Sequence, residues 1–202
     1  MARTGYWIGR GWQIVTGNSN HFWIFVLLTL VYLIATSVAS STVIGLLLNG
    51  PLTAALLAVF LYLVDTGRLD INRLQDGLNN FLHTMLAGLL IQLFTAIGLA
   101  LCIIPGIIVA AFYLFPLLLN IDRRMEFWDA MEESRKRVQQ DLVGFVVFVL
   151  ALTGINILGA LLFGVGLLVS IPVTAAAITV AYRELWPEQL SPIISTEPPA
   201  AP

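Results

Sequence analysis

The sequence predicts an all-helical membrane protein with six transmembrane helices, arranged as three hairpins with amphipathic interfacial helices on one charged face. First, 58% of the residues are apolar and only 11% are charged, whereas soluble domains carry about 25% charged residues. Second, every charged residue lies in one of four short segments, 3–10, 65–76, 122–141 and 183–202. Third, each apolar stretch between them is long enough for two crossings of about 20 residues, and these stretches lack the alternation of barrel strands.

The first element is a predicted interfacial helix over 4–16. Ile8, Trp12 and Val15 fall on one helical face, with Tyr6 and Trp7 alongside. Aromatic rings favour the headgroup region of a bilayer, and an amphipathic helix of this kind lies in the interface plane. We therefore expect this segment to lie on the membrane surface before the first crossing.

Six crossings follow, and each hairpin consists of a first arm and a second arm. The predicted crossings are 22–41, 44–64, 84–103, 106–121, 142–162 and 165–183. Proline lacks the backbone N–H that a helix interior requires, and glycine lowers helix propensity. These residue types mark candidate structural hinges at Gly50, Pro51, Pro105, Gly106, Pro116 and Pro172. The short fourth crossing should kink at Pro116, and we prefer a full crossing to a hairpin that turns back.

Two further helices are predicted on the membrane surface, over 70–82 and 125–139. The first carries an apolar residue every three or four positions, at Ile71, Leu74, Leu78 and Phe81, which is the pattern of an amphipathic helix. The second carries two oppositely charged pairs four residues apart, Glu132 with Lys136 and Glu133 with Arg137, in the stabilising order.

The charge distribution also predicts the orientation. All Lys and Arg residues lie in the charged segments, and the turns near 42, 104 and 164 carry none. Positively charged loops remain on the cytoplasmic side, so both termini are expected in the cytoplasm. Residues 1–186 form a single integral membrane domain in this prediction, and the proline-rich tail 187–202 is expected to be disordered.

The three hairpins share features that suggest a degenerate repeat, although these residues are common in membrane helices. A proline lies near the start of each second arm, at Pro51, Pro105 and Pro172. Each second arm also contains a tyrosine, at Tyr62, Tyr113 and Tyr182.

No catalytic residue, metal site or cofactor is predicted. The interior of the crossings contains no Asp, Glu, Lys or Arg, and proton relays and ion pathways usually need such groups. Asp76 and His83 are two helical turns apart, about 10 Å, so they cannot ligate one ion unaided. A lipid-modifying enzyme using Asp76, His83 or Asp122 at the interface is a third, weaker hypothesis. The net charge of −2 gives no reason to expect nucleic-acid binding.

Gln92 and Asn156 are the strongest polar groups at mid-crossing depth. They could line a path for a neutral solute. The alternative, which we favour, is that they form interhelical hydrogen bonds, which usually contribute less than about 2 kcal/mol in membranes.

The segment 122–141 is a candidate surface for a protein partner or lipid headgroups. Its candidate contact residues are Asp122, Arg123, Arg124, Ser134, Arg135, Lys136 and Arg137. Basic clusters beside a crossing attract anionic lipid. Acidic residues neutralise this segment, however, so we interpret it chiefly as a paired surface helix that docks a partner.

Part of the chain resembles a known group of proteins. Ile104-Pro105-Gly106-Ile107-Ile108, then Pro116, then Asp122-Arg123-Arg124 and Phe127-x-x-Ala130-Met131-x-x-Ser134 occur in this order. This pattern resembles a broad group of prokaryotic six-helix membrane proteins. The group is similar to the membrane domain of some bacterial glycerophosphodiester phosphodiesterases and to an enterobacterial inner-membrane family of unassigned function. The resemblance implies a fold and a prokaryotic plasma membrane location, but no catalytic residues.

The leading functional hypothesis is a non-enzymatic membrane protein with an accessory, scaffolding or envelope-maintenance role. It would act through its cytoplasmic-face helices on a membrane or cytoplasmic protein. The alternative is a transporter or channel for a neutral or amphipathic small solute. The lipid bilayer is the expected environment in both cases, and the sequence leaves the oligomeric state open.

Overall fold

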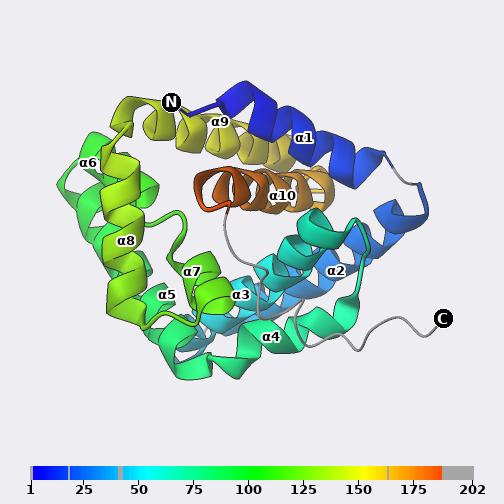
Figure 1. Ribbon diagram of the computed structural model, residues 1–202, viewed down its shortest axis with the longest axis horizontal. Helices are drawn as coiled ribbons and strands as arrows, with labels where there is room; N and C mark the ends of the chain where they lie inside the picture. The colour runs from blue at the N-terminus through cyan, green and yellow to red at the C-terminus, as the bar shows by residue number, and fades with distance from the viewer. Residues whose placement is uncertain (1, 18, 41–42, 163, 188–202) are drawn as a thin grey trace.

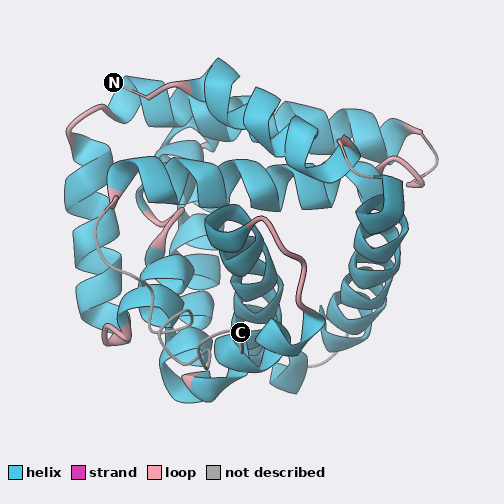
Figure 2. Ribbon diagram, turned by 45° about the vertical axis from the view of Figure 1, so that its right-hand side comes forward, coloured by secondary structure: helices cyan, strands magenta, loops and turns pink. Residues whose placement is uncertain are grey.

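The computed structural model describes residues 2–17, 19–40, 43–162 and 164–187, and over these ranges the protein is helical and contains no strand (Figure 2). The helices are α1 Thr4–Thr16, α2 Ser19–Ser40, α3 Val43–Thr66, α4 Leu74–Asn79, α5 Phe81–Leu101, α6 Ile103–Phe112, α7 Pro116–Arg123, α8 Phe127–Gln139, α9 Leu142–Leu161 and α10 Leu167–Leu185. One 3₁₀ turn, Ile71–Arg73, precedes α4. The tail beyond residue 187, predicted to be disordered, lies outside the described residues.

Five helical segments among the described residues are long and apolar enough to cross a membrane. They are Gly45–Thr66, Phe81–Ala100, Ile104–Arg123, Leu142–Leu161 and Leu167–Leu185. The apolar part of α2, Phe22–Val38, falls in a shorter class. The class prediction, an all-helical membrane protein, is therefore confirmed, because five such helices need an apolar solvent.

The segment predicted as the fourth crossing, 106–121, is divided between two helices. α6 ends at Phe112 and α7 begins at Pro116, so the chain breaks where a kink was predicted. Pro116 occupies the first turn of α7, where a missing backbone N–H costs nothing. At Pro51 and Pro172, by contrast, α3 and α10 continue as helices.

The segment 70–82 differs from the single surface helix that was predicted. Asp70 caps a 3₁₀ turn by accepting a hydrogen bond from the Asn72 N–H at 3.0 Å. α4 then ends at Asn79, and Asn80 adopts a non-helical backbone conformation. The predicted apolar stripe faces outward, since Leu78 and Phe81 are exposed. Gly77 makes the close contact instead, against the backbone of α3.

α1 has the predicted bounds but packs through a different face. Trp7, Gly11 and Val15 are buried, whereas Trp12, which was predicted on the same helical face as Val15, is 53% exposed. A Cβ on Gly11 would lie 2.8 Å from the Ala177 backbone nitrogen of α10. The absence of a side chain at Gly11 therefore allows α1 to lie directly against α10, which it contacts along its length (Figure 1).

The apolar helices form a closed ring in which one packing pattern occurs three times. The first arms are α2, α5 and α9, and the second arms are α3, the broken pair α6–α7, and α10. Each first arm contacts its own second arm and also the second arm of the preceding pair: α5 contacts α3, α9 contacts α6, and α2 contacts α10. The last of these contacts closes the ring.

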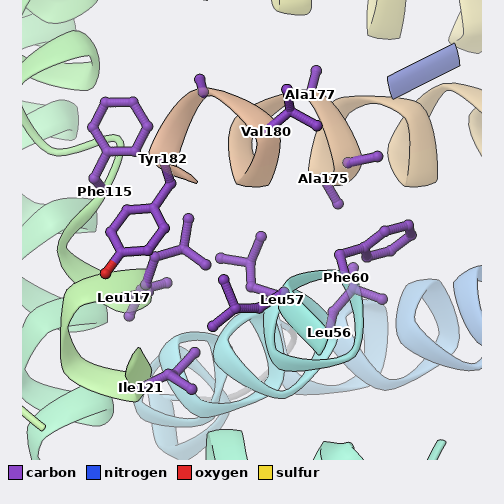
Figure 3. Close-up of a cluster of buried hydrophobic side chains, with 14 of the residues drawn as sticks. Leu56, Leu57, Phe60, Phe115, Leu117, Ile121, Ala175, Ala177, Val180 and Tyr182 are labelled. Carbon is purple, nitrogen blue, oxygen red and sulfur yellow. The ribbon is translucent and has the colours of Figure 1, made fainter. Parts of the chain in front are cut away.

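The second arms form the inside of the bundle. In α3, 67% of the apolar stretch is buried, against 22% in α5 and 28% in α9. Figure 3 shows the result, a layer of apolar side chains from α3, α7 and α10 that face one another. Apolar residues on the first arms remain exposed in the isolated chain, as expected for surfaces that face lipid.

The shorter helices α1, α4 and α8 lie on three sides of the molecule (Figure 1). Each packs on the second arm of the preceding pair through a small side chain. Gly11 of α1 lies against α10, Gly77 of α4 against α3, and Ser134 of α8 against the α6–α7 break. The three helices are thus built into the bundle, and their small residues determine how closely they approach it.

Candidate functional site

An ionic cluster joins the ends of the three second arms. Arg183 of α10 binds Asp65 at the end of α3 through Nε and Nη2, at 2.6 and 2.5 Å. The same guanidinium binds Asp122 at the end of α7, with Nη1 and Nη2 at 2.8 and 2.9 Å from its two oxygens. The side chains of Arg183, Asp65 and Asp122 are only 17%, 11% and 4% exposed, respectively. One arginine therefore connects three elements that are far apart in the sequence.

Tyr182 completes this cluster. Its hydroxyl donates to Asp122 Oδ2 at 2.7 Å, and the side chain is buried. Charge-assisted hydrogen bonds of this kind are shorter and stronger than neutral ones. A buried charge without its partner is costly, so the cluster holds only while all three arms are in place.

An apolar plug lies next to the cluster, on its inner side. It consists of buried side chains from the three second arms: Leu56, Leu57, Phe115, Leu117, Ile121, Val180 and Tyr182. Figure 3 shows the Tyr182 ring directed from α10 towards Leu117 of α7. The Tyr182 side chain belongs to both the plug and the ionic cluster, so the two are in direct contact.

A central chamber of about 510 Å³ lies beyond the plug. Every arm of the ring contributes to its wall, through Tyr32 of α2, Thr53 of α3, Ile91 of α5, Ala110 of α6, Asn156 of α9 and Thr174 of α10. The remaining wall is mainly leucine, isoleucine and alanine. The chamber therefore lies on the axis of the threefold packing pattern.

A side chamber of about 360 Å³ adjoins it and is more polar. Asn49, Gln92 and Thr36 line this space, together with Gly50 and Gly88. The two chambers share the wall residues Tyr32, Thr53, Ile91 and Leu117. Across this wall the Tyr32 hydroxyl and Thr53 Oγ1 form a hydrogen bond at 3.2 Å.

Gln92 forms the predicted interhelical hydrogen bonds and also lines the side chamber. Its amide nitrogen donates to the carbonyls of Leu46 and Gly88, each at 3.2 Å, and its oxygen accepts from Asn49 Nδ2 at 3.4 Å. These contacts join α3 and α5, and the same side chain lines the side chamber. The buried Asn49 Oδ1 has no hydrogen-bond partner in the structure. An orphaned acceptor of this kind requires a donor, so this site suits a hydroxyl or amide N–H.

Asn156 is a structural residue at the edge of the central chamber. Its amide donates to the Leu152 carbonyl and to Thr174 Oγ1, both at 3.0 Å. Its oxygen accepts from Ser170 Oγ at 2.9 Å. Asn156 and Gln92 line different chambers, so the predicted pair does not form one continuous polar path.

Neither chamber has a charged side chain in its described wall. An ion would lose its hydration there without compensation. The walls instead offer one polar corner, around Asn49 and Gln92, and a larger apolar space. Such an arrangement fits a neutral molecule with a small hydrogen-bonding group and an apolar body.

Two predicted surface residues on the 122–141 segment are in fact buried. Asp122 belongs to the ionic cluster. Ser134 donates from Oγ to the Phe112 carbonyl at 2.6 Å and accepts from the Phe115 N–H at 3.4 Å. Ser134 therefore forms hydrogen bonds with backbone groups that the α6–α7 break leaves without helical partners. Because Ser134 is buried, its assignment to a docking surface is wrong.

The other predicted surface residues are spread over different contacts. Arg137 donates to the Leu185 carbonyl of α10 at 3.0 Å. Arg135 and Lys136 both pair with Glu132, at 2.7 and 3.5 Å, and the hydrogen bond from Arg135 holds the pKa of Glu132 below its ordinary value. Arg123 is half-buried, and Arg124 is exposed in a left-handed conformation, with φ 51°, at the end of α7.

Two of the predicted hinge residues, Gly50 and Gly106, lie where neighbouring helices approach each other closely. A Cβ on Gly88 of α5 would lie 2.4 Å from the Gly50 Cα of α3, next to Pro51. Gly98 of α5 packs in the same way against Gly106 of α6, next to Pro105. Small residues of this kind allow membrane helices to approach closely. Among the predicted hinge residues, only Pro116 is the first residue of a helix, α7.

Among the described residues, no group of three His, Cys, Asp or Glu side chains could hold a metal ion. Sequence reasoning missed the ionic cluster and Asn49. Each second arm carries one member of the cluster near its end, Asp65, Asp122 or Arg183, but no local pattern in the sequence indicates that these ends meet.

These features define an all-helical membrane protein with an uncharged chamber that all six arms line. No family model matches the chain, and no solved structure matches it. The chain is similar to uncharacterised proteins of Mycobacterium bovis and of two strains of Mycobacterium tuberculosis, with 33% identity over 158 residues in each. The matched region covers 72% of this chain and 48% of each relative. The chain thus spans about half the length of these curated relatives, and their names assign no activity.

Proposed function

We propose that this protein is a six-crossing protein of a bacterial plasma membrane, with both termini in the cytoplasm, that binds and carries a neutral amphipathic small molecule. Three helix pairs and the confinement of charge to one face support the six crossings. The bacterial relatives and the positive-inside bias support the location and orientation.

The observation that carries the proposed activity is the central chamber that all six arms line. Its volume of about 510 Å³ falls within the range of about 300–1,000 Å³ typical of small-molecule sites. A site near the middle of the membrane, at the interface between repeated units, is also where secondary transporters bind substrate. The uncharged walls restrict the ligand to a neutral molecule.

Plug and cluster suggest how the molecule would be released. Both lie between the chamber and the charged face, so passage to that face requires the second arms to separate there. Breaking the four hydrogen bonds of Arg183 would accompany this movement. The present structure then corresponds to a state closed towards the cytoplasm.

A pair of matched lipids tests the binding. We expect 1-oleoylglycerol, a neutral molecule with two hydroxyl groups, to bind the purified protein with one-to-one stoichiometry in native mass spectrometry. 1-Oleoyl-lysophosphatidic acid has the same chain and glycerol but carries a charged phosphate, and it should bind to the chamber at least about tenfold more weakly. Chamber binding is the part of the retained lipid that is lost in Ala110→Trp, since Ala110 lines the chamber and not the other sites. If this part is equal for the two lipids, or absent for both, the proposal is contradicted.

A second proposal is the accessory role, in which the protein docks a partner protein, and fewer residues of the structure support it. Asp122 and Ser134 are committed to internal contacts, and Arg137 contacts α10. The exposed candidate residues on this side are Arg124 and Lys136, next to Trp128, which is 58% exposed. Recovery of a stoichiometric protein partner in mild detergent, lost in an Arg124→Glu, Lys136→Glu variant, would favour this role over the carrier.

A further inference from the structure

We propose that a cleft between α1, α3 and α10 binds the phosphate of a phospholipid headgroup from the cytoplasmic leaflet. The cleft is separate from both chambers and has a volume of about 690 Å³. It lies where the charged ends of α3 and α10 meet α1. Its wall contains no residue of either chamber, so the inference concerns a second ligand.

The cleft has an apolar side and a polar side. Ile14, Leu63, Val64 and Val180 supply the apolar side. Arg3, Tyr6, Arg10, Gln13 and Glu184 supply the polar side. A phospholipid presents the same two surfaces at the membrane–water interface, its upper acyl chain and its phosphate. Basic pockets between helices on the cytoplasmic side are known to bind lipid headgroups.

Arg10 is the residue best placed to bind phosphate. Arg183 is occupied by two aspartates, and Arg3 lies 3.3 Å from Glu184. Arg10 is exposed and forms no ion pair with a carboxylate of the described residues, and its contact with Gln13 is long, at 3.5 Å. A guanidinium binds phosphate through two parallel hydrogen bonds.

The nearby carboxylate does not oppose this assignment. Glu184 accepts hydrogen bonds from Arg3 Nη1 at 3.3 Å and from Trp7 Nε1 at 2.6 Å. Its charge is therefore already balanced by residues other than Arg10. The exposed rings of Tyr6 and Trp12 on α1 are typical of the headgroup level of a bilayer, which places Arg10 at the depth of lipid phosphates.

Native mass spectrometry from nanodiscs that contain phosphatidylglycerol and phosphatidylcholine tests this site. We expect the wild-type protein to retain one phosphatidylglycerol molecule and Arg10→Gln to lower its apparent affinity about tenfold, the effect of losing charge-assisted hydrogen bonds. Arg10→Lys should retain part of the affinity. The matched control is Arg68→Gln, because Arg68 is an exposed arginine on the same face outside the cleft.

Each other outcome would overturn the proposal. Equal retention by wild type, Arg10→Gln and Arg68→Gln would show that Arg10 does not bind the lipid. Displacement of phosphatidylglycerol by millimolar inorganic phosphate would assign the cleft to free phosphate instead of a lipid. Both leaflets of a nanodisc are accessible, so failure here is independent of the proposed orientation and of chamber binding.

Discussion

Replacing Arg183 with methionine is expected to cause a large loss of folded protein. The change removes four hydrogen bonds and leaves Asp65 and Asp122 buried without their cation. Removing one partner of a buried ion pair costs about 3–5 kcal/mol, a large part of a typical folding free energy of about 5–15 kcal/mol. Because Arg183 connects all three second arms at their charged ends, all three should loosen together.

Thermal unfolding in mild detergent, followed by the monodisperse fraction on size exclusion, measures this effect. Arg68→Met is the matched control, since Arg68 is exposed on the same face, and it should unfold close to the wild-type temperature. A triple variant with Asp65→Asn, Asp122→Asn and Arg183→Met removes all three charges and should recover much of the lost stability. If Arg183→Met unfolds at the same temperature as Arg68→Met, the cluster does not hold the arms together.

Replacing Ala110 with tryptophan is expected to abolish binding of 1-oleoylglycerol while the protein remains folded. Ala110 lines the central chamber, so an indole there enters open space, whereas the same change in a packed core would cost about 1–3 kcal/mol. The filled chamber should lower the affinity for the lipid by at least about tenfold. Titration of the lipid in native mass spectrometry, together with the unfolding temperature, separates loss of binding from loss of fold.

The control for this variant is Ala160→Trp. Ala160 is exposed on α9 and lines neither chamber, so its replacement should leave binding unchanged. If Ala110→Trp binds 1-oleoylglycerol as tightly as Ala160→Trp does, the lipid occupies a surface other than the chamber.

The class of fold and most element bounds were predictable because charge and apolar length are local properties of the sequence. The predicted helix 4–16 coincides with α1, and the predicted 142–162 differs from α9 by one residue. The segment 70–82 was less predictable. Its division into a 3₁₀ turn after Asp70 and a short helix that ends before Asn80 depends on packing against α3.

Packing faces were not predictable from hydrophobicity. In water, apolar residues indicate the inside of a protein, but in lipid they also suit the outside. The apolar and aromatic residues of α1 therefore indicated an interfacial helix but did not indicate Gly11, which lies against the α10 backbone. Small residues on the surface helices were the better signal.

The candidate site was predictable in part. Gln92 was selected as a polar group at mid-crossing depth, and it does reach a chamber. The ionic cluster was missed because its hydrogen bonds join residues 61 and 118 positions apart, beyond any local pattern. The chamber itself depends on how six arms meet, which sequence periodicity does not specify.

Photo-crosslinking tests the central claim, that the chamber binds a neutral amphipath, most directly. A 1-oleoylglycerol analogue with a diazirine in its acyl chain would be bound to the purified protein, irradiated, and the modified peptides mapped by mass spectrometry. The account predicts modification of chamber residues such as Leu114 and Ile171, with competition by unlabelled 1-oleoylglycerol. Modification confined to outward-facing residues such as Val147 and Leu158, without competition, would contradict it.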